Sequence, residues 1–333
     1  MKIKRIYIDN FKSLVDFKLT EPNPFTVFVG ANGVGKSNIF EALEFLNYTS
    51  SVNTKLSENL FGGYQNFVNF NGYKKPLTIE IQSEFNRFGY NREPYESNSK
   101  NEIVAFGGPV PFKNSFEEDH PLILEFEQVK ENFSRIFINT KEEKKINLNS
   151  DEKLDFDCNN LELVLSRILN NEDISIEIKE WIGLFIPGFK NIEIVTELSE
   201  TKSIQFYEKG YESPFGKKLI SDGTYNILCL FTAIYQTESP QFLCIEEPEN
   251  GLNPYVIKEL VTFFREQCKE KGHYIWLNTH SQTLVNQLKP EEIIVVNKEN
   301  GITVAKQFNG KDMHGMAMDT AWLTNFFGGG VPW

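Results

Sequence analysis

Gly30-Ala31-Asn32-Gly33-Val34-Gly35-Lys36-Ser37 follows the pattern G-x-x-x-x-G-K-[ST], and this stretch decides the fold prediction. The apolar run before it, residues 25–29, is typical of a buried strand. Residues 38–46 after it space their apolar side chains as an amphipathic helix does. A strand, a glycine loop and a helix in this order form a phosphate-binding loop, so we expect an α/β protein that binds a nucleoside triphosphate.

The residue types of this loop define the expected phosphate chemistry. Its glycines let successive backbone N–H groups turn toward the phosphates, and the start of the following helix adds the positive end of its dipole. Lys36 supplies a point charge for the β- and γ-phosphates, and the Ser37 hydroxyl is a ligand for Mg²⁺. We therefore predict that ATP binds through Asn32, Gly33, Gly35, Lys36 and Ser37, with Mg²⁺ as cofactor. The alternative is a glycine-rich turn that precedes a Lys-Ser pair by chance.

Composition limits the other classes of function. The 333 residues are 40% hydrophobic and 24% charged, which is ordinary for a globular protein, and no apolar run approaches the roughly 20 residues of a membrane helix. We expect a cytoplasmic protein with no membrane partner. The net charge of −12 argues against a broad nucleic-acid interface, although a local basic patch stays open. None of the four cysteines forms a C-x-x-C pair, which disfavours a zinc site.

A second motif, residues 242–249, is an apolar run that ends in carboxylates. In an α/β sheet the carboxyl end of such a strand lies beside the phosphate loop. We expect Glu246 to lie near Mg²⁺ and Glu247 to act as the general base for the attacking water. An acidic turn that caps a strand would explain one of these carboxylates but not three.

Two further stretches are informative only in combination with these motifs. Residues 221–224, Ser-Asp-Gly-Thr, precede a predicted helix over 225–235, and alone they read as an ordinary helix N-cap. The predicted strand 274–279 ends in front of His280. A single histidine at a strand end is usually structural, but this one follows the carboxylate strand.

Together with residues 8–13, these motifs resemble the RecF/SMC-like branch of the ABC-type ATPases, and in particular its compact AAA-21 group. The resemblance implies a head-to-head dimer with two ATP molecules at the interface. Ser221 and Gly223 would contact the γ-phosphate bound by the other subunit, and His280 would sense the γ-phosphate in its own site. Residues 250–253 would form the D-loop across the same interface.

The sequence departs from this pattern at three points. Glu246 stands where many relatives have Asp, and the signature reads Ser-Asp-Gly-Thr in place of Ser-Gly-Gly-Gln. The glutamine that should reach the metal has no clear position. We predict Gln82 as this metal ligand, with Gln65 and Gln128 as competing candidates.

The predicted fold is an α/β ABC-type ATPase head with a mixed central sheet, an antiparallel N-terminal β-subdomain and a compact α+β insertion. Residues 1–60 would form the N-terminal lobe with the phosphate loop, 61–210 the β-subdomain and mixed insertion, and 211–333 the C-terminal lobe. The predicted insertion lacks helical heptads. Residues 86–119 read as a long loop, 122–126 and 135–138 as strands, and 161–169 and 174–185 as helices.

The predicted function is ATP binding and hydrolysis by a homodimer or higher oligomer. OLD nucleases, which the chain also resembles, carry a TOPRIM domain after the ATPase, whereas no acid cluster after His280 suggests a nuclease. We expect the chain to regulate a separately encoded nuclease or toxin in anti-phage defence. The alternatives are a slow-turnover clamp or sensor, and a DNA repair or maintenance ATPase that acts on nucleic acid.

Overall fold

The computed structural model describes residues 1–51, 54–69, 75–84, 87–92, 101–102, 128–138, 151–312 and 315–328. Its strands are β1 (Ile3–Asp9), β2 (Phe17–Thr20), β3 (Phe25–Val29), β4 (Leu77–Ser83), β5 (Arg87–Arg92), β6 (Asn101–Glu102), β7 (Phe133–Ile136), β8 (Phe189–Thr196), β9 (Lys202–Glu208), β10 (Phe215–Gly216), β11 (Phe242–Glu246), β12 (Tyr274–Thr279), β13 (Ile293–Glu299) and β14 (Ile302–Gln307). Its α-helices are α1 (Lys36–Ser51), α2 (Thr54–Leu60), α3 (Tyr64–Phe67), α5 (Leu161–Leu169), α6 (Glu172–Phe185), α7 (Asp222–Tyr235), α8 (Pro254–Glu270), α9 (Gln282–Val285) and α10 (Met318–Leu323).

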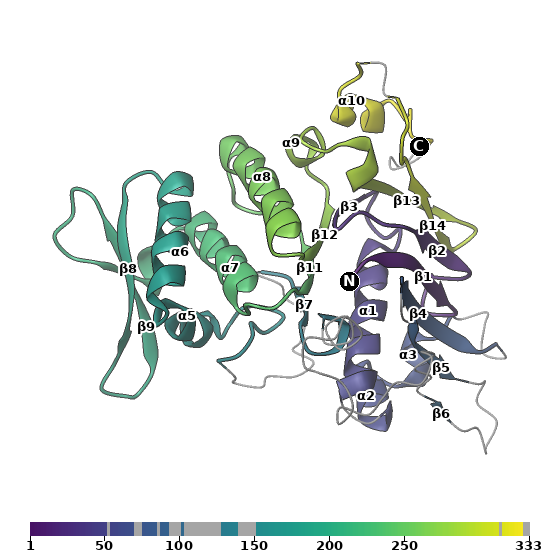
Figure 1. Ribbon diagram of the computed structural model, residues 1–333, viewed down its shortest axis with the longest axis horizontal. Helices are drawn as coiled ribbons and strands as arrows, with labels where there is room; N and C mark the ends of the chain where they lie inside the picture. The colour runs from purple at the N-terminus through teal and green to yellow at the C-terminus, as the bar shows by residue number, and fades with distance from the viewer. Residues whose placement is uncertain are drawn as a thin grey trace.

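A six-stranded sheet in the order β14-β13-β3-β12-β11-β7 forms the centre of the molecule (Figure 1). Its strands pair in parallel except β14, which returns antiparallel beside β13. The parallel strands β3, β11 and β12 are buried along their whole length, as expected for strands covered on both faces. Their carboxyl ends meet at one edge, which brings together the phosphate loop, Glu246 and Thr279.

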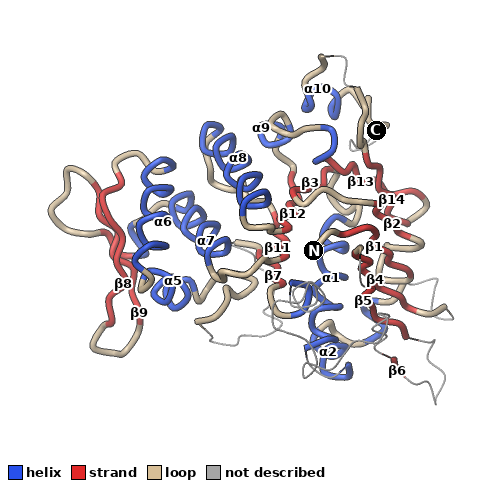
Figure 2. Tube along the Cα trace, in the orientation of Figure 1, coloured by secondary structure: helices blue, strands red, loops and turns tan. Residues whose placement is uncertain are grey.

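Side chains that alternate along these strands enter two different cores. Val27, Ile245 and Leu277 face the core shared with α5, α6, α7 and α8. Phe28 and Trp276 point the other way, into the core shared with α1 and the N-terminal sheet. This alternation, which follows from the two-residue period of a strand, lets one sheet anchor helices on both of its faces (Figure 2).

The N-terminal part forms a separate antiparallel sheet in the order β2-β1-β4-β5-β6. One prediction is corrected here, because residues 87–92 form β5 and do not continue a loop. Tyr90 of β5 is fully buried and packs against Phe45 of α1. This tertiary contact stabilises the strand, although the sequence of the segment is largely polar. The strand predicted at 122–126 lies outside the described residues.

Between β7 and α7 the chain forms the insertion, with α5, α6 and a three-stranded sheet in the order β10-β9-β8 (Figure 1). Asn171 caps α6 by accepting a hydrogen bond from the backbone N–H of Ile174. The helices predicted at 161–169 and 174–185 are confirmed. The three-part division of the chain stays a prediction. Among the described helices, none is long and apolar enough to cross a membrane.

Candidate nucleotide-binding site

The phosphate loop connects β3 to α1. Gly33 and Gly35 have φ angles of 75° and 106°, a region that side chains with a Cβ rarely adopt. A Cβ on Gly35 would lie 2.1 Å from Oγ1 of Thr303 and 2.7 Å from Oγ of Ser13. The loop is therefore restricted to glycine at this position by conformation and by space, while Asn32 and Gly33 are exposed.

Lys36, the first residue of α1, folds back over the loop. Its Nζ donates hydrogen bonds to the carbonyl oxygens of Gly30 at 2.8 Å and Ala31 at 3.0 Å. Burial lowers the pKa of Lys36 to about 8, against the opposing effects of Glu247 and Glu246. The ammonium is thus held at the loop close to two carboxylates, in the position expected for a phosphate-binding cation.

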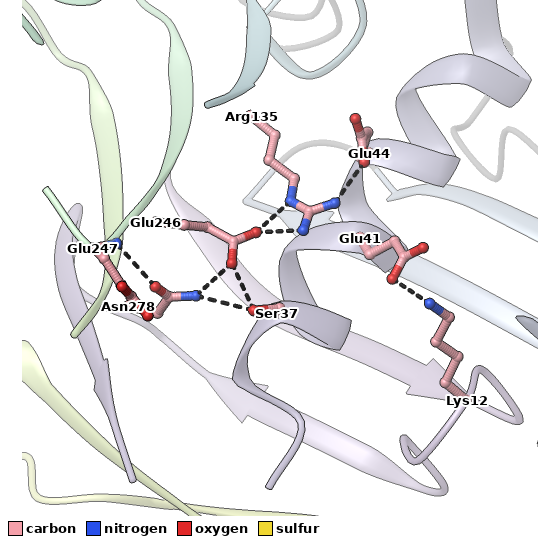
Figure 3. A network of polar contacts seen from close by, with 8 residues as sticks. All are labelled: Lys12, Ser37, Glu41, Glu44, Arg135, Glu246, Glu247 and Asn278. Carbon is pink, nitrogen blue, oxygen red and sulfur yellow. Dashed lines mark hydrogen bonds and ion pairs between the residues drawn. The ribbon is translucent and has the colours of Figure 1, made fainter. Parts of the chain in front are cut away.

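Ser37 meets the carboxylate strand through a short hydrogen bond (Figure 3). Its hydroxyl donates to Oε2 of Glu246 at 2.6 Å. Nδ2 of Asn278, from β12, donates to the same oxygen at 3.1 Å. The structure thus brings together Ser37 and Glu246, two of the three residues predicted as metal ligands, and adds Asn278, which the sequence did not single out.

Arg135 and Glu44 complete this network and were also missed. Nε of Arg135 donates to Oε1 of Glu246 at 2.7 Å, its Nη2 contacts the same oxygen, and its Nη1 donates to Oε2 of Glu44 at 2.8 Å. Burial acts to lower the pKa of Arg135, but Glu44 and Glu246 outweigh it and raise the pKa overall. The available sequence signal was an arginine inside a predicted strand that proves to be buried.

Glu247, the predicted general base, follows directly after β11. It has a φ of 47°, which turns its side chain away from the direction of the strand. Its N–H donates to the backbone carbonyl of Asn278 at 3.0 Å and to Oδ1 of that residue at 3.2 Å. Nδ2 of Asn250 donates to Oε2 of Glu247 at 3.0 Å. The backbone of Glu247 is therefore held by the neighbouring strand, and its carboxylate is held by the predicted D-loop.

His280 lies at the end of β12, where its side chain is exposed. Burial of part of the ring lowers the pKa of His280, Lys36 lowers it further, and Glu247 opposes both. The backbone N–H of His280 donates to Oε1 of Glu249 at 3.3 Å, and the hydroxyl of Thr279 donates to the same oxygen. Glu249 thus ties the end of β12 to the carboxylate motif.

Ser221 and Gly223 lie at the start of α7. Ser221 caps the helix by accepting from the N–H of Thr224 at 3.1 Å. A Cβ on Gly223 would lie 2.5 Å from the carbonyl oxygen of Gly251, so the signature loop packs directly on the D-loop. Nδ2 of Asn226 reinforces this contact by donating to the carbonyl of Asn250 at 2.6 Å. Within one chain these contacts join the signature loop to the D-loop and not to Lys36 or Ser37.

The three candidate glutamines lie in different places. Gln82 is exposed on β4 and pairs with Arg5 of β1. The carboxyl end of β1, from which the chain continues toward the phosphate loop, pairs instead with Thr78 at the other end of β4. The structure does not bring Gln82 to Ser37, so Gln82 is not part of the proposed site. Gln128 donates to the carbonyls of Gln241 and Gly272, which precede β11 and β12 and so lie at the opposite edge of the sheet.

Gln65 lines a cavity of about 550 Å³ beside the phosphate loop. Lys12 and Ser13 line the same cavity. The hydroxyl of Ser13 contacts Oγ1 of Thr303 at 2.6 Å and accepts from Nδ2 of Asn38 in α1 at 2.7 Å. The cavity therefore adjoins the residues that hold the loop.

The donor set fits Mg²⁺. A hydroxyl and a carboxylate are hard oxygen donors, and Mg²⁺ is usually held by one or two such groups together with phosphate oxygens and water. Within the described ranges, no three His, Cys, Asp or Glu side chains gather into a group that could hold a metal ion. Ser37 and Glu246 would hold the ion, and the triphosphate and water would supply its remaining ligands.

Comparison with known proteins identifies one family that the chain matches and several proteins that are similar to parts of it. Residues 25–286 match the AAA_21 family, described as "AAA domain, putative AbiEii toxin, Type IV TA system". The DNA replication and repair protein RecF of Lactococcus lactis subsp. cremoris (strain MG1363) is 40% identical over 60 residues, which cover 18% of this chain and 17% of that protein. The chromosome partition protein Smc of Methanocaldococcus jannaschii is 40% identical over 67 residues, which cover 20% of this chain and 6% of that protein. The matches thus span less than a third of either curated relative.

Two solved structures show the same fold. The SMC head domain from Thermotoga maritima matches with a TM-score of 0.53 and 17% identity, covering 92% of this chain and 99% of that one. The Smc head bound to the C-terminal winged-helix domain of ScpA matches with a TM-score of 0.60 and 16% identity, covering 92% and 98%. The predicted fold class is confirmed. The chain belongs to the AAA_21 family and is a RecF/SMC-like ABC-type ATPase with the fold of an SMC head.

Proposed function

We propose that the chain binds Mg²⁺-ATP at the phosphate loop and hydrolyses it to ADP and phosphate. The observation that carries the proposal is the 2.6 Å contact between Ser37 and Glu246, which joins the phosphate loop to the carboxylate strand. Bound Mg²⁺ would neutralise charge on the β- and γ-phosphates. Lys36 would add a second positive charge on the same phosphates.

Glu247 is the proposed general base. Asn250 and Asn278 hold it by its carboxylate and its backbone, so its position does not depend on a mobile side chain. The carboxylate would accept a proton from the water that attacks the γ-phosphorus. His280, exposed at the same edge, would donate a hydrogen bond to the γ-phosphate. The cavity at Lys12 and Ser13 is where we place the ribose and the base.

We further propose that two chains complete each other's sites. Ser221 is exposed, and its hydroxyl contacts the neighbouring Thr224, so a second subunit could approach this loop from solvent. Leu219 and Tyr255, next to the signature loop and the D-loop, expose 73% and 65% of their surface. Large apolar side chains beside a polar motif favour a protein interface. The SMC-head fold of the relatives supports the same arrangement.

Nucleotide binding tests the site. Lys36→Ala should weaken ATP binding at least 100-fold, measured by isothermal titration calorimetry, because the β- and γ-phosphates lose their point charge. Lys258→Ala removes an exposed lysine of α8 and should bind as the wild type does. Unchanged affinity in Lys36→Ala would refute the site, and wild-type protein that binds ATP without turnover would favour the slow clamp or sensor.

The finer proposal is that ATP state regulates a separately encoded effector, a nuclease or toxin, in anti-phage defence. The toxin system named in the family description supports it. The RecF relatives favour a second candidate, an ATPase of DNA repair or maintenance. Affinity purification from the native host in ATP, with Lys36→Ala as the control, should recover a partner protein only with the wild type. Turnover stimulated by purified DNA without any partner would favour the second candidate.

A further inference from the structure

We propose that Arg135 is a positioning residue that orients Glu246 for the metal, an inference that rests on the proposed ATPase function. Its side chain is only 3% exposed, and it lies between the carboxylates of Glu246 and Glu44. None of the sequence motifs includes it. The structural question is why a buried cation lies at this point of the sheet, between two carboxylates.

The register of the sheet explains how Arg135 reaches Glu246 (Figure 3). β7 runs parallel to β11 with Arg135 opposite Cys244. Side chains two residues apart on a strand point to the same face, so Cys244 and Glu246 share a face. A long side chain at position 135 can therefore extend diagonally to the end of β11. The guanidinium arrives where the carboxylate strand ends and the phosphate-binding site begins.

Helix α1 supplies the other half of the arrangement. Ser37 and Glu44 are seven residues apart, about two helical turns, so they lie on one face of the helix. Ser37 contacts Glu246 directly, and Glu44 contacts Nη1 of Arg135 at 2.8 Å. Arg135 thus links α1 to β11 through Glu44 and Glu246. This link is a second connection between the two elements, in addition to the direct contact between Ser37 and Glu246.

The two oxygens of Glu246 have different partners. Oε1 takes both hydrogen bonds from Arg135, from Nε and from Nη2. Oε2 accepts from Ser37 and from Asn278. A guanidinium that grips one oxygen through two of its N–H groups fixes the plane of the carboxylate. Only Oε2 is then presented to the metal position beside Ser37.

The charges support an orienting role. The buried cluster of Glu44, Arg135 and Glu246 carries a net charge of about −1, where the two carboxylates alone would carry about −2 and would repel each other. Arg135 therefore offsets part of the negative charge of this buried network and holds the carboxylate of Glu246 in place. Lysine keeps the charge, but it lacks the planar fork that makes these contacts together.

The test compares Arg135→Lys with a matched control, Arg92→Lys. Arg92 is another buried arginine, 6% exposed in its side chain, which pairs with Glu58 and lies over the ring of Tyr64. Binding of a fluorescent ATP analogue is measured in EDTA and at increasing Mg²⁺. Circular dichroism and thermal melting show whether each variant is folded.

In Arg135→Lys we expect unchanged affinity in EDTA, because Lys36 and the loop are intact. The gain in affinity on adding Mg²⁺ should fall about tenfold, and the Mg²⁺ concentration for half-maximal ATPase should rise similarly, as is typical when a group that orients a metal ligand is lost. Arg92→Lys should lose stability without a change in either quantity. Glu44→Gln keeps the contact between Arg135 and Glu246, so it should change both quantities in the same direction but by less. It provides the test if Arg135→Lys does not fold.

The positioning role would be overturned if folded Arg135→Lys gained as much nucleotide affinity from Mg²⁺ as the wild type does. If Arg135→Lys does not fold, the same result in Glu44→Gln would overturn it. Either result would leave the proposed function intact. Wild-type protein that binds no nucleotide in EDTA or in Mg²⁺ would instead overturn the proposed function. An equal loss in Arg135→Lys and Arg92→Lys would assign Arg135 to stability alone.

Discussion

The hydroxyl of Ser37 lies 2.6 Å from Oε2 of Glu246, although 209 residues separate them in sequence. One begins α1 and the other ends β11, and the parallel sheet places both at its carboxyl edge. This contact makes one site of two motifs and leads to predictions about catalysis, assembly and stability.

Glu247→Gln should lower ATP turnover at least 100-fold while leaving ATP affinity within about twofold, because an amide cannot accept the proton that a general base removes. Phosphate release measures turnover. Light scattering after size exclusion should show an ATP-bound dimer that accumulates in this variant. Glu266→Gln, at an exposed position of α8, is the control and should turn over normally. Normal turnover in Glu247→Gln would assign the base elsewhere.

A mixture of two inactive variants tests the shared site. Lys36→Ala disables the phosphate loop, and Ser221→Arg should disable the signature loop that serves the other subunit. In a mixed dimer one site receives both defects and the other receives neither. An equal mixture should therefore recover about a quarter of the wild-type rate if pairing is random and the sites are independent. No recovery above the separate variants, with mixed dimers shown by mass spectrometry, would argue against sites completed by a second subunit.

Gly223→Ala should disturb the contact between the signature loop and the D-loop. The new Cβ would lie 2.5 Å from the carbonyl oxygen of Gly251, so the backbone must move. We expect a stability loss of about 1–3 kcal/mol in chemical unfolding. Dimer formation in ATP should weaken as well. Gly216→Ala is the matched control, because a Cβ at this position would have nothing within 4 Å and its φ is −76°. Equal behaviour of the two variants would show that the loops are not tightly packed.

His273 predicts a loss of stability in acid. The residue is fully buried, and burial lowers the pKa of His273 to about 4 from a usual 6.5. Between these values the unfolded chain binds the proton that the folded chain excludes, so stability falls as the pH falls from 6.5 toward 4. From pH 7.5 to pH 5 this contribution is about 2 kcal/mol. Urea unfolding of His273→Gln should show a correspondingly smaller loss over this range, and an equal loss in both proteins would contradict the assignment.

Much of the fold could be predicted because its signals are local. The glycines of residues 30–37 need a tight turn, and the uninterrupted apolar runs of β3, β11 and β12 need burial on both faces. These signals also placed Glu246 beside Ser37, because parallel strands gather their carboxyl ends. β5 could not be predicted in this way, since its order comes from pairing with β4 and from packing on α1.

The phosphate loop, the carboxylate strand and the signature loop, in the order of an ABC-type ATPase, can all be recognised from local sequence. Tertiary contacts, in contrast, bring Arg135 and Glu44 to Glu246 and place Gln82 on β4 opposite Arg5, and neither arrangement could be predicted from local sequence. The physical reason is strand register, which sets the reach of a side chain across neighbouring strands and has no local signature in the sequence.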